Sequence, residues 1–342
     1  MRRRTLDARC YTDPAIYAAE REAVFAASWQ LVAASRQLPR KGDTLALTVA
    51  GWPLLLARGD DGVLRGFHNV CRHRAGPMLW DGQAEHCRVL RCRYHGWQYD
   101  LRGRLIRTPG FGAEVGETSL FSVACEEWRG LVFVHLRPEA APSLASFLGS
   151  FVAEAAGVDF EGLQVGARAR HELACNWKTY VENYLEGYHI PYLHRSLSRE
   201  VDIDAYEVRA ADRHVVHLVP TKGGATYDGF WAWLWPNVAL NVYNNGMSIE
   251  RIVPTGGQTM AIEYVYLFDD LSDEAAARRA ASQQMSHDVT REDIQVCEAV
   301  QRNLAAGVYR SGELSPRHER GVGHFQQLVR EALGDLVEES AS

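Results

Sequence analysis

Two short stretches decide the fold of the first half of the chain: NVCRHRAGPM at residues 69–78 and RCRYHGWQYDLRGRL at residues 91–105. The first contains Cys71 and His73, and the second contains Cys92 and His95, so each stretch supplies one thiol and one imidazole. Eighteen residues lie between His73 and Cys92. Zinc sites with two Cys and two His usually keep the two cysteines in one pair and the two histidines in the other. The interleaved order therefore favours another metal centre, with a zinc knuckle as the alternative.

A binuclear iron cluster explains the interleaving better. In a Rieske centre two cysteines hold one iron and two histidines hold the other, and the neutral imidazoles raise the reduction potential above that of an all-thiolate cluster. We therefore expect a [2Fe–2S] cluster held by Cys71, His73, Cys92 and His95.

The residues around these stretches have a β pattern. Short apolar runs such as TLALTVAG at 44–51, PLLLAR at 53–58 and LVFVHL at 131–136 alternate with Gly-rich turns. We expect a small antiparallel β domain over residues 41–140. A helical segment over residues 1–40, with a helix at 13–30, should precede it and pack on the second domain.

A second group of metal-binding residues lies in ENYLEGYHIPYLH at residues 182–194. On a continuous helix, His189 and His194 would point about 140° apart and would not bind one ion. Pro191 should end or kink the helix, which lets the two imidazoles converge. Two His and one carboxylate, with open coordination positions, form the facial triad of Fe(II) oxygenases.

Both groups resemble the motifs of the Rieske non-haem iron oxygenases, whose α subunits are the terminal oxygenases of ring-hydroxylating systems. The resemblance implies an α+β chain in which the Rieske domain precedes a helix-grip catalytic domain at 165–342, with mononuclear Fe(II) as the second cofactor. It assigns the third iron ligand to Asp293 in REDIQVCEAVQ. The alternative acids are Asp288, Glu292 and Glu298.

The resemblance also gives roles to Glu186 and Asn183. Most relatives have an aspartate at the position of Glu186, which hydrogen-bonds an iron histidine and a Rieske histidine of the neighbouring subunit. Glu186 lies three residues before His189 and should share a helix face with it. An ordinary ion pair with Lys178 or Arg195 is the alternative. Asn183 corresponds to a polar residue beside the iron, and a plain packing role competes with this assignment.

Composition limits the partners. The formal charge of −6 gives no general attraction to nucleic acid. No run of eighteen apolar residues and no secretory signal is present, so we expect a cytoplasmic protein without a membrane partner. Seven cysteines, thinly spread, indicate reduced thiols. No dinucleotide-binding glycine motif or plant-type ferredoxin spacing occurs, so a separate NAD(P)H-dependent reductase, with or without a ferredoxin, should supply electrons. The resemblance implies a homotrimer.

The substrate is less constrained. An aromatic stretch that includes Trp231, Trp233 and Trp235 suits a cavity for an arene or a quaternary ammonium ion, although most of these rings should be core. With glutamate at position 186, the chain resembles the branch of this family that oxidises carnitine, betaine and choline-like amines. We expect O₂-dependent hydroxylation or oxidative demethylation of a small aromatic or N-methylated compound. The alternatives are a cis-dihydroxylating arene dioxygenase and a non-catalytic helix-grip binding protein with a zinc-stabilised β domain.

Overall fold

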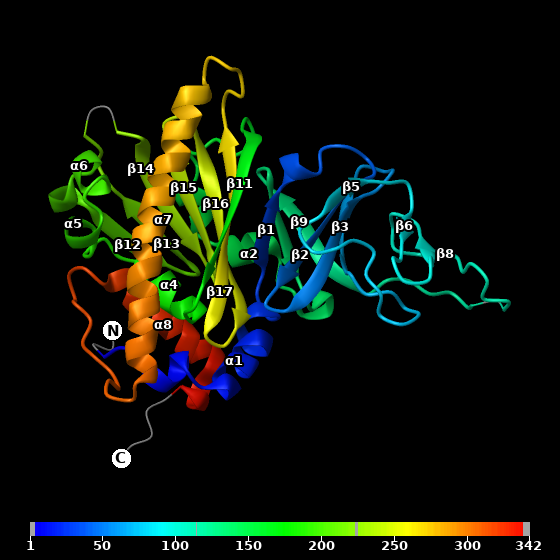
Figure 1. Cartoon of the computed structure of the whole chain (residues 1–342), viewed down its shortest axis with the longest axis horizontal. Helices are drawn as coiled ribbons and strands as arrows, with labels where there is room; N and C mark the ends of the chain where they lie inside the picture. The colour runs from blue at the N-terminus through cyan, green and yellow to red at the C-terminus, as the bar shows by residue number, and fades with distance from the viewer. Residues whose placement is uncertain (1–3, 114, 223–224, 338–342) are drawn as a thin grey trace. The chain divides into compact units, whose positions relative to one another are not determined.

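A computed structural model describes residues 4–113, 115–222 and 225–337 (Figure 1). Contacts divide the chain into two compact units. The small unit is Ala26–Leu144, and the large unit takes in the described residues up to Phe25 and from Ala145 onward. Among the described residues, no helix combines the length and apolar character needed to cross a membrane.

The small unit is built from two antiparallel sheets, as the β pattern predicts. Seven strands form one sheet in the order β1-β10-β9-β4-β3-β2-β5, and the other has the order β6-β7-β8. The strands are β1 (Gln30–Ala34), β2 (Asp43–Val49), β3 (Trp52–Arg58), β4 (Leu64–His68), β5 (Ala84–His86), β6 (Leu90–Arg91), β7 (Gln98–Tyr99), β8 (Leu105–Arg107), β9 (Ser122–Trp128) and β10 (Leu131–His135).

The expected helix over 13–30 ends earlier than its sequence pattern suggested. Asp13 caps α1 (Pro14–Glu20) by accepting from the backbone N–H of Ala15, and a π-helical turn at Arg21–Phe25 completes the helical part. The chain then enters β1, whose five residues are all buried and pair with β10. Pairing with a strand far along the chain overrides local helix periodicity at this point.

The large unit is a seven-stranded antiparallel sheet with a long helix packed along it (Figure 1). The strand order is β11-β17-β16-β15-β14-β13-β12. Its strands are β11 (Gln164–Leu173), β12 (Glu207–Ala211), β13 (His214–Leu218), β14 (Tyr227–Leu234), β15 (Val238–Tyr243), β16 (Gly246–Gly256) and β17 (Thr259–Phe268). The helices that follow α1 are α2 (Leu144–Leu148), α3 (Phe151–Glu154), α4 (Trp177–Tyr184), α5 (Ile190–Leu193), α6 (Leu197–Glu200), α7 (Ala276–Ala305) and α8 (Arg320–Leu333). This arrangement confirms the predicted helix-grip fold.

The buried face of α7 is polar rather than apolar. Its buried residues recur every three or four positions, as one helix face requires, and are mostly small or polar: Ser282, Ser286, Thr290, Asp293, Cys297, Gln301 and Leu304. Ser286 Oγ lies 2.9 Å from the hydroxyl of Tyr266, and Thr290 Oγ1 lies 2.8 Å from that of Tyr264. Hydrogen bonds to sheet residues therefore hold this helix, and they leave room for a cavity beside Asp293.

The N-terminal segment is tied to α4 by a buried ion pair. Glu20 at the end of α1 pairs with Lys178, and both side chains are fully buried. The indole N–H of Trp177 donates to Glu20 Oε2 at 2.7 Å. Because the acid has two donors and the amine has its counter-charge, the desolvation cost of burying both groups is offset. The pair fixes the start of the helix that leads into ENYLEGYHIPYLH.

Candidate functional site

The small unit brings Cys71, His73, Cys92 and His95 together on two adjoining loops. The first loop follows β4, and the second lies between β6 and β7. The backbone N–H of Arg93 donates to the carbonyl of Pro77 at 2.8 Å, which joins the two loops. The rings of His73 and His95 lie 4.7 Å apart, and the two cysteine side chains interact with each other.

These residues fit a metal cluster because one buried ring nitrogen lacks a partner and both thiols are buried beside it. His73 Nδ1 is buried and has no hydrogen-bond partner, while its ring stacks on Trp97 at 4.9 Å. Cys71 and Cys92 are each 3% exposed, and Cys71 Sγ lies 3.2 Å from the hydroxyl of Tyr99. An unpartnered buried nitrogen costs free energy unless a ligand completes it. A cluster with two sulfur and two nitrogen ligands meets this requirement.

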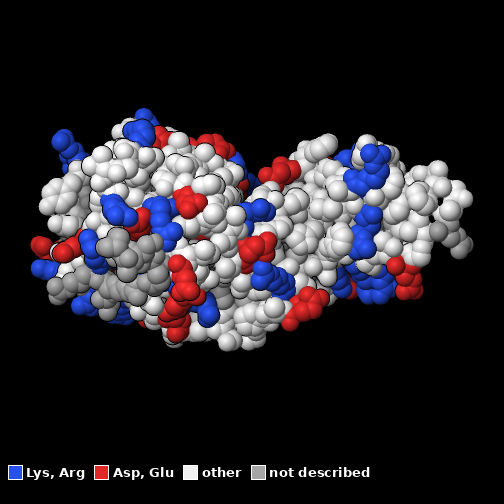
Figure 2. All heavy atoms as spheres, turned by 90° about the horizontal axis from the view of Figure 1, so that it is seen from below, with Lys and Arg blue, Asp and Glu red and all other residues white. Residues whose placement is uncertain are grey.

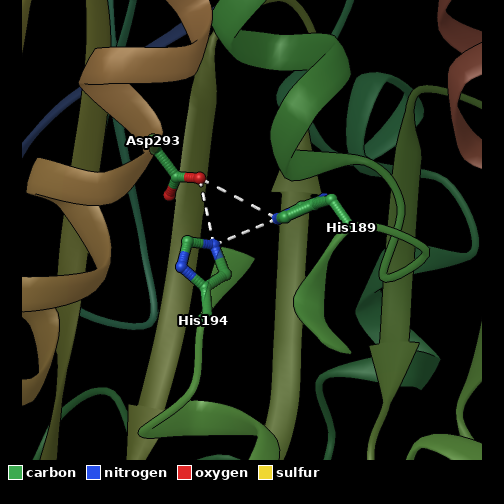
Figure 3. Close-up of side chains that lie close together, drawn as sticks. All are labelled: His189, His194 and Asp293. Atoms are coloured by element: carbon green, nitrogen blue, oxygen red, sulfur yellow. Dashed lines mark hydrogen bonds and ion pairs between the residues drawn. The ribbon is translucent and has the colours of Figure 1, made fainter. Parts of the chain in front are cut away.

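In the large unit, His189, His194 and Asp293 point toward one another (Figure 3). His189 and His194 flank the short helix α5, and Asp293 projects from α7. The two Nε2 atoms lie 3.1 Å apart, and Asp293 Oδ1 lies 3.1 Å from His194 Nε2 and 3.8 Å from His189 Nε2. Asn183 Nδ2 donates to the same Oδ1 at 2.7 Å.

A carboxylate lies within hydrogen-bond distance of the Nδ1 atom of each histidine. Glu186 Oε1 lies 2.6 Å from His189 Nδ1, and Glu292 Oε2 lies 2.7 Å from His194 Nδ1. Each Nδ1 therefore carries the proton and donates it, an assignment made from the hydrogen-bond network. Each Nε2 then presents a lone pair toward the centre of the group. Two lone pairs and a carboxylate oxygen that converge in this way need a cation between them, so the donor set fits Fe(II).

A cavity opens beside the three residues. The volume of this cavity is about 70 Å³. Its wall combines iron-site residues with aromatic rings, among them Tyr180, Tyr184, Tyr206, Tyr227 and Trp231. A small organic molecule would therefore lie next to the metal position.

Comparison with known proteins assigns a domain family to each part of the chain. The Rieske [2Fe-2S] domain model matches residues 28–124, and the model of the ring hydroxylating alpha subunit (catalytic domain) matches residues 160–219 and 211–335. The carnitine monooxygenase oxygenase subunit of Escherichia coli (strain K12) is 31% identical, with 97% of this chain and 94% of that protein covered. The chain belongs to the Rieske-type ring-hydroxylating oxygenases.

Two further relatives resemble this oxygenase over nearly its whole length. The chloroplastic choline monooxygenase of Beta vulgaris is 28% identical, over 94% of this chain and 76% of that protein. The solved structure of a quaternary ammonium Rieske monooxygenase in complex with its substrate L-carnitine is 28% identical. That structure has a TM-score of 0.85, with 96% of this chain and 95% of the other covered. The oxygenase thus has a Rieske [2Fe–2S] cluster and a mononuclear iron as cofactors.

The structure corrects the predicted helix that would carry both Glu186 and His189. Helix α4 ends at Tyr184, so Glu186 and His189 lie in the turn before α5 and not on one continuous helix. Pro191 stands in the first turn of α5, where proline is tolerated, and does not end a helix. The side chain of Glu186 reaches His189 nonetheless, and Lys178 is paired with Glu20 instead.

The competing acids have other partners. Glu292 contacts Nδ1 of His194, the ring nitrogen that faces away from Asp293. Glu298 Oε1 accepts from the backbone N–H of Ala174 at 3.0 Å. Asp288 accepts from Gln284 on the exposed side of α7. Of the four acids that the sequence offered, Asp293 alone among the described residues places a carboxylate oxygen within 4.8 Å of ring nitrogens of both His189 and His194.

Sequence reasoning missed two buried groups near the iron site. The hydroxyl of Tyr206 forms a hydrogen bond with His217 Nδ1 at 2.6 Å, and His217 is fully buried. Glu250, on the cavity wall, is only 3% exposed. The available signal for Glu250 was a charged residue inside the apolar run SIERIVP, which predicts a solvent-facing position unless a buried site needs it.

Proposed function

We propose that this chain is the terminal monooxygenase of a multicomponent system and that it oxidises a small N-methylated compound. In this proposal Cys71, His73, Cys92 and His95 hold the Rieske cluster. His189, His194 and Asp293 hold the mononuclear iron. The observation that carries the proposal is the convergence of two Nε2 atoms and one carboxylate oxygen beside a small aromatic cavity. The relatives named for choline and carnitine oxidation support the substrate class.

The reaction consumes O₂ and two electrons. One oxygen atom enters a C–H bond of the substrate, and the other leaves as water with two protons. When bound, the iron supplies the site at which O₂ is activated. Glu186 and Glu292 hold the two imidazoles in one tautomer, and Asn183 orients the carboxyl group of Asp293. These contacts keep the ligand geometry ready for the metal and the substrate.

Electrons come from a separate NAD(P)H-dependent reductase, directly or through a ferredoxin. Residues 65–107, which include both Rieske loops, contain nine Arg, no Lys and three Asp or Glu, in a chain whose net charge is −6. Figure 2 shows basic side chains gathered on the surface of this unit. An electron donor with an acidic docking face would be attracted to it.

The proposal includes a homotrimer in which Glu186 links His189 of one subunit to His95 of the next. Family membership and the contact between Glu186 and His189 support this part of the proposal. Glu186→Gln should keep both metals and slow product formation at least 10-fold, because the charge behind His189 is lost. Glu274→Gln, an exposed change of the same kind, should match the wild type. Wild-type turnover in Glu186→Gln, or a strictly monomeric active enzyme, would refute the link.

Coupled O₂ uptake tests the activity itself. The holoenzyme with a competent reductase and NAD(P)H should consume O₂ and form product with choline or another N-methylated amine. Formation of a cis-dihydrodiol from a fused arene, with no reaction of any N-methylated compound, would instead favour an arene dioxygenase.

A further inference from the structure

The wall of the iron cavity contains an acid that the iron chemistry does not use. Glu250 lies on β16 and is 3% exposed. The next residue along the strand, Arg251, forms an ion pair with Glu263 at 2.7 Å. Within the part of the chain that the structure describes, no Lys or Arg pairs with Glu250, so its charge has no protein counter-ion.

The groups around Glu250 hold it in place as a hydrogen-bond acceptor. The hydroxyl of Tyr180 donates to Oε1 at 2.7 Å, and Asn241 Nδ2 donates to Oε2 at 3.0 Å. The hydroxyl of Tyr184 lies 3.0 Å from Asn241 Oδ1, which fixes the amide so that its N–H groups face the acid. Two donors directed at one carboxyl group favour its ionised form.

Aromatic rings and one unpartnered donor form another part of the wall. The rings of Tyr227 and Trp231 lie 5.2 Å apart, and the rings of Tyr206 and Trp231 lie 6.3 Å apart. Trp231 is 7% exposed, and its indole N–H has no hydrogen-bond partner. Trp231 pairs with Asn241 across β14 and β15, and Asn241 contacts Glu250. Trp231 and Glu250 both line the same cavity.

The only basic side chains in the described wall of this cavity are histidines. Among the described residues that line it, none is Lys or Arg. A substrate carboxylate would lose its hydration on entry, and none of the described lining residues offers a Lys or Arg side chain to replace it. A substrate that carries only a positive charge would find Glu250 and the faces of aromatic rings, the surroundings that favour quaternary ammonium ions.

We propose that Glu250 is the counter-ion for the ammonium group of a substrate that lacks a carboxylate, and that the indole N–H of Trp231 donates to a hydroxyl group of that substrate. This inference rests on the proposed function and narrows its substrate class to choline-like ammonium alcohols, as opposed to zwitterions such as betaines.

The energetics of burial support this assignment. Burial raises the pKa of Glu250, and hydrogen bonds from Tyr180, Tyr264 and Asn241 oppose the rise. A bound cation compensates the buried negative charge directly. The preference for a cation should therefore be large with Glu250 and small with a neutral side chain of the same shape, which leaves only the aromatic faces.

The test compares choline with 3,3-dimethylbutan-1-ol, a neutral isostere in which carbon replaces the charged nitrogen. Binding to the anaerobic holoenzyme is measured by calorimetry. The wild type should bind choline at least 10-fold more tightly than the isostere. Glu250→Gln should bring the two affinities to within about two-fold, and Glu250→Asp should restore part of the difference. Equal affinities in the wild type would overturn the proposal without any variant.

Glu182→Gln is the matched control. Glu182 is a half-buried acid that is held in the same way: its Oε1 accepts from the hydroxyl of Tyr11 at 2.6 Å and from Gln326 Nε2 at 2.9 Å. It does not line the iron cavity. A purely structural effect of removing a buried acid would lower the affinities for choline and its isostere equally in either variant. Only loss of a counter-ion changes their ratio.

Two further measurements complete the test. Trp231→Phe should weaken choline binding several-fold and leave ethyltrimethylammonium, which has no hydroxyl group, unchanged. Glycine betaine should bind the wild type at least 10-fold more weakly than choline, and tighter binding of glycine betaine would contradict the proposal. If choline is oxidised with the same KM by the wild type and Glu250→Gln, the role of Glu250 fails while the proposed function stands. If no N-methylated compound supports coupled O₂ uptake, the proposed function fails as well.

Discussion

Single residues set the chemistry of both iron sites. The spacing of Cys71, His73, Cys92 and His95, and of the two histidines at 189 and 194, predicts two groups of metal-binding residues, because metal ligands recur at short spacings in the sequence. The structure brings the residues of each group together, and their roles as ligands stay predictions. The contact of Glu292 with His194 was not predictable, because four acids on one helix look alike until the fold shows which of them faces the site. Glu250 was missed for the same reason, since burial of a charge is a tertiary property.

His217 gives the large unit a pH dependence that can be measured. It is fully buried, and burial lowers the pKa of its imidazole from 6.5 to about 3. As the pH falls, the imidazole of the unfolded chain therefore binds a proton near pH 6.5, whereas that of the folded chain binds one only near pH 3. This contribution to stability is complete above pH 6.5 and is lost as the pH falls toward 3.

His217→Asn should remove this slope while its amide oxygen still accepts the hydroxyl proton of Tyr206. Between pH 7.5 and 5.5 the wild type should lose about 1.4 kcal/mol more unfolding free energy than the variant, measured by urea denaturation. Equal losses in the two proteins would show that His217 does not titrate in this way.

At the scale of elements, a close helix contact lies next to the segment that carries the proposed iron ligands. Gly321 in α8 lies against the end of α4, so that a Cβ atom there would be 2.3 Å from the carbonyl oxygen of Leu185. Leu185 directly precedes Glu186. The sequence showed only a glycine inside a helical pattern, which does not reveal what lies next to it.

Gly321→Ala should lower the unfolding free energy by about 1–3 kcal/mol, because the clash with backbone outweighs the helix propensity that alanine gains. The variant should also retain less iron in the large unit, since Leu185 must move. Gly157→Ala is the control, because nothing lies within 4 Å of its added Cβ. Full stability and full iron content in Gly321→Ala would refute the contact.

The elements themselves were predictable to different degrees. Strands with apolar runs, such as β3 and β17, and the long helix α7 follow from their patterns. Strand β11 was missed because its residues alternate between exposed and half-buried and include two Arg, His and Glu. It is a strand because it pairs with β17, and that pairing cannot be read from its own sequence.

At the scale of the whole molecule, charge is distributed unevenly. The basic segment at residues 65–107 should attract an acidic electron donor, so reductase-driven O₂ uptake should fall at least 10-fold between 50 and 500 mM NaCl. Product formation in a single turnover of dithionite-reduced enzyme, which needs no donor, should change little. Equal salt dependence of both reactions would rule out electrostatic docking.

The most direct test of the central claim is an iron and sulfide analysis of the wild type, Cys92→Ser and Asp293→Ala. The claim is that one chain holds two separate iron sites with the ligands named above. Cys92→Ser should lose the sulfide, the two cluster irons and the red-brown colour, and should keep the mononuclear iron. Asp293→Ala should keep the cluster spectrum and lose the mononuclear iron. Stoichiometric zinc in the wild type, or loss of both centres together in either folded variant, would contradict the claim.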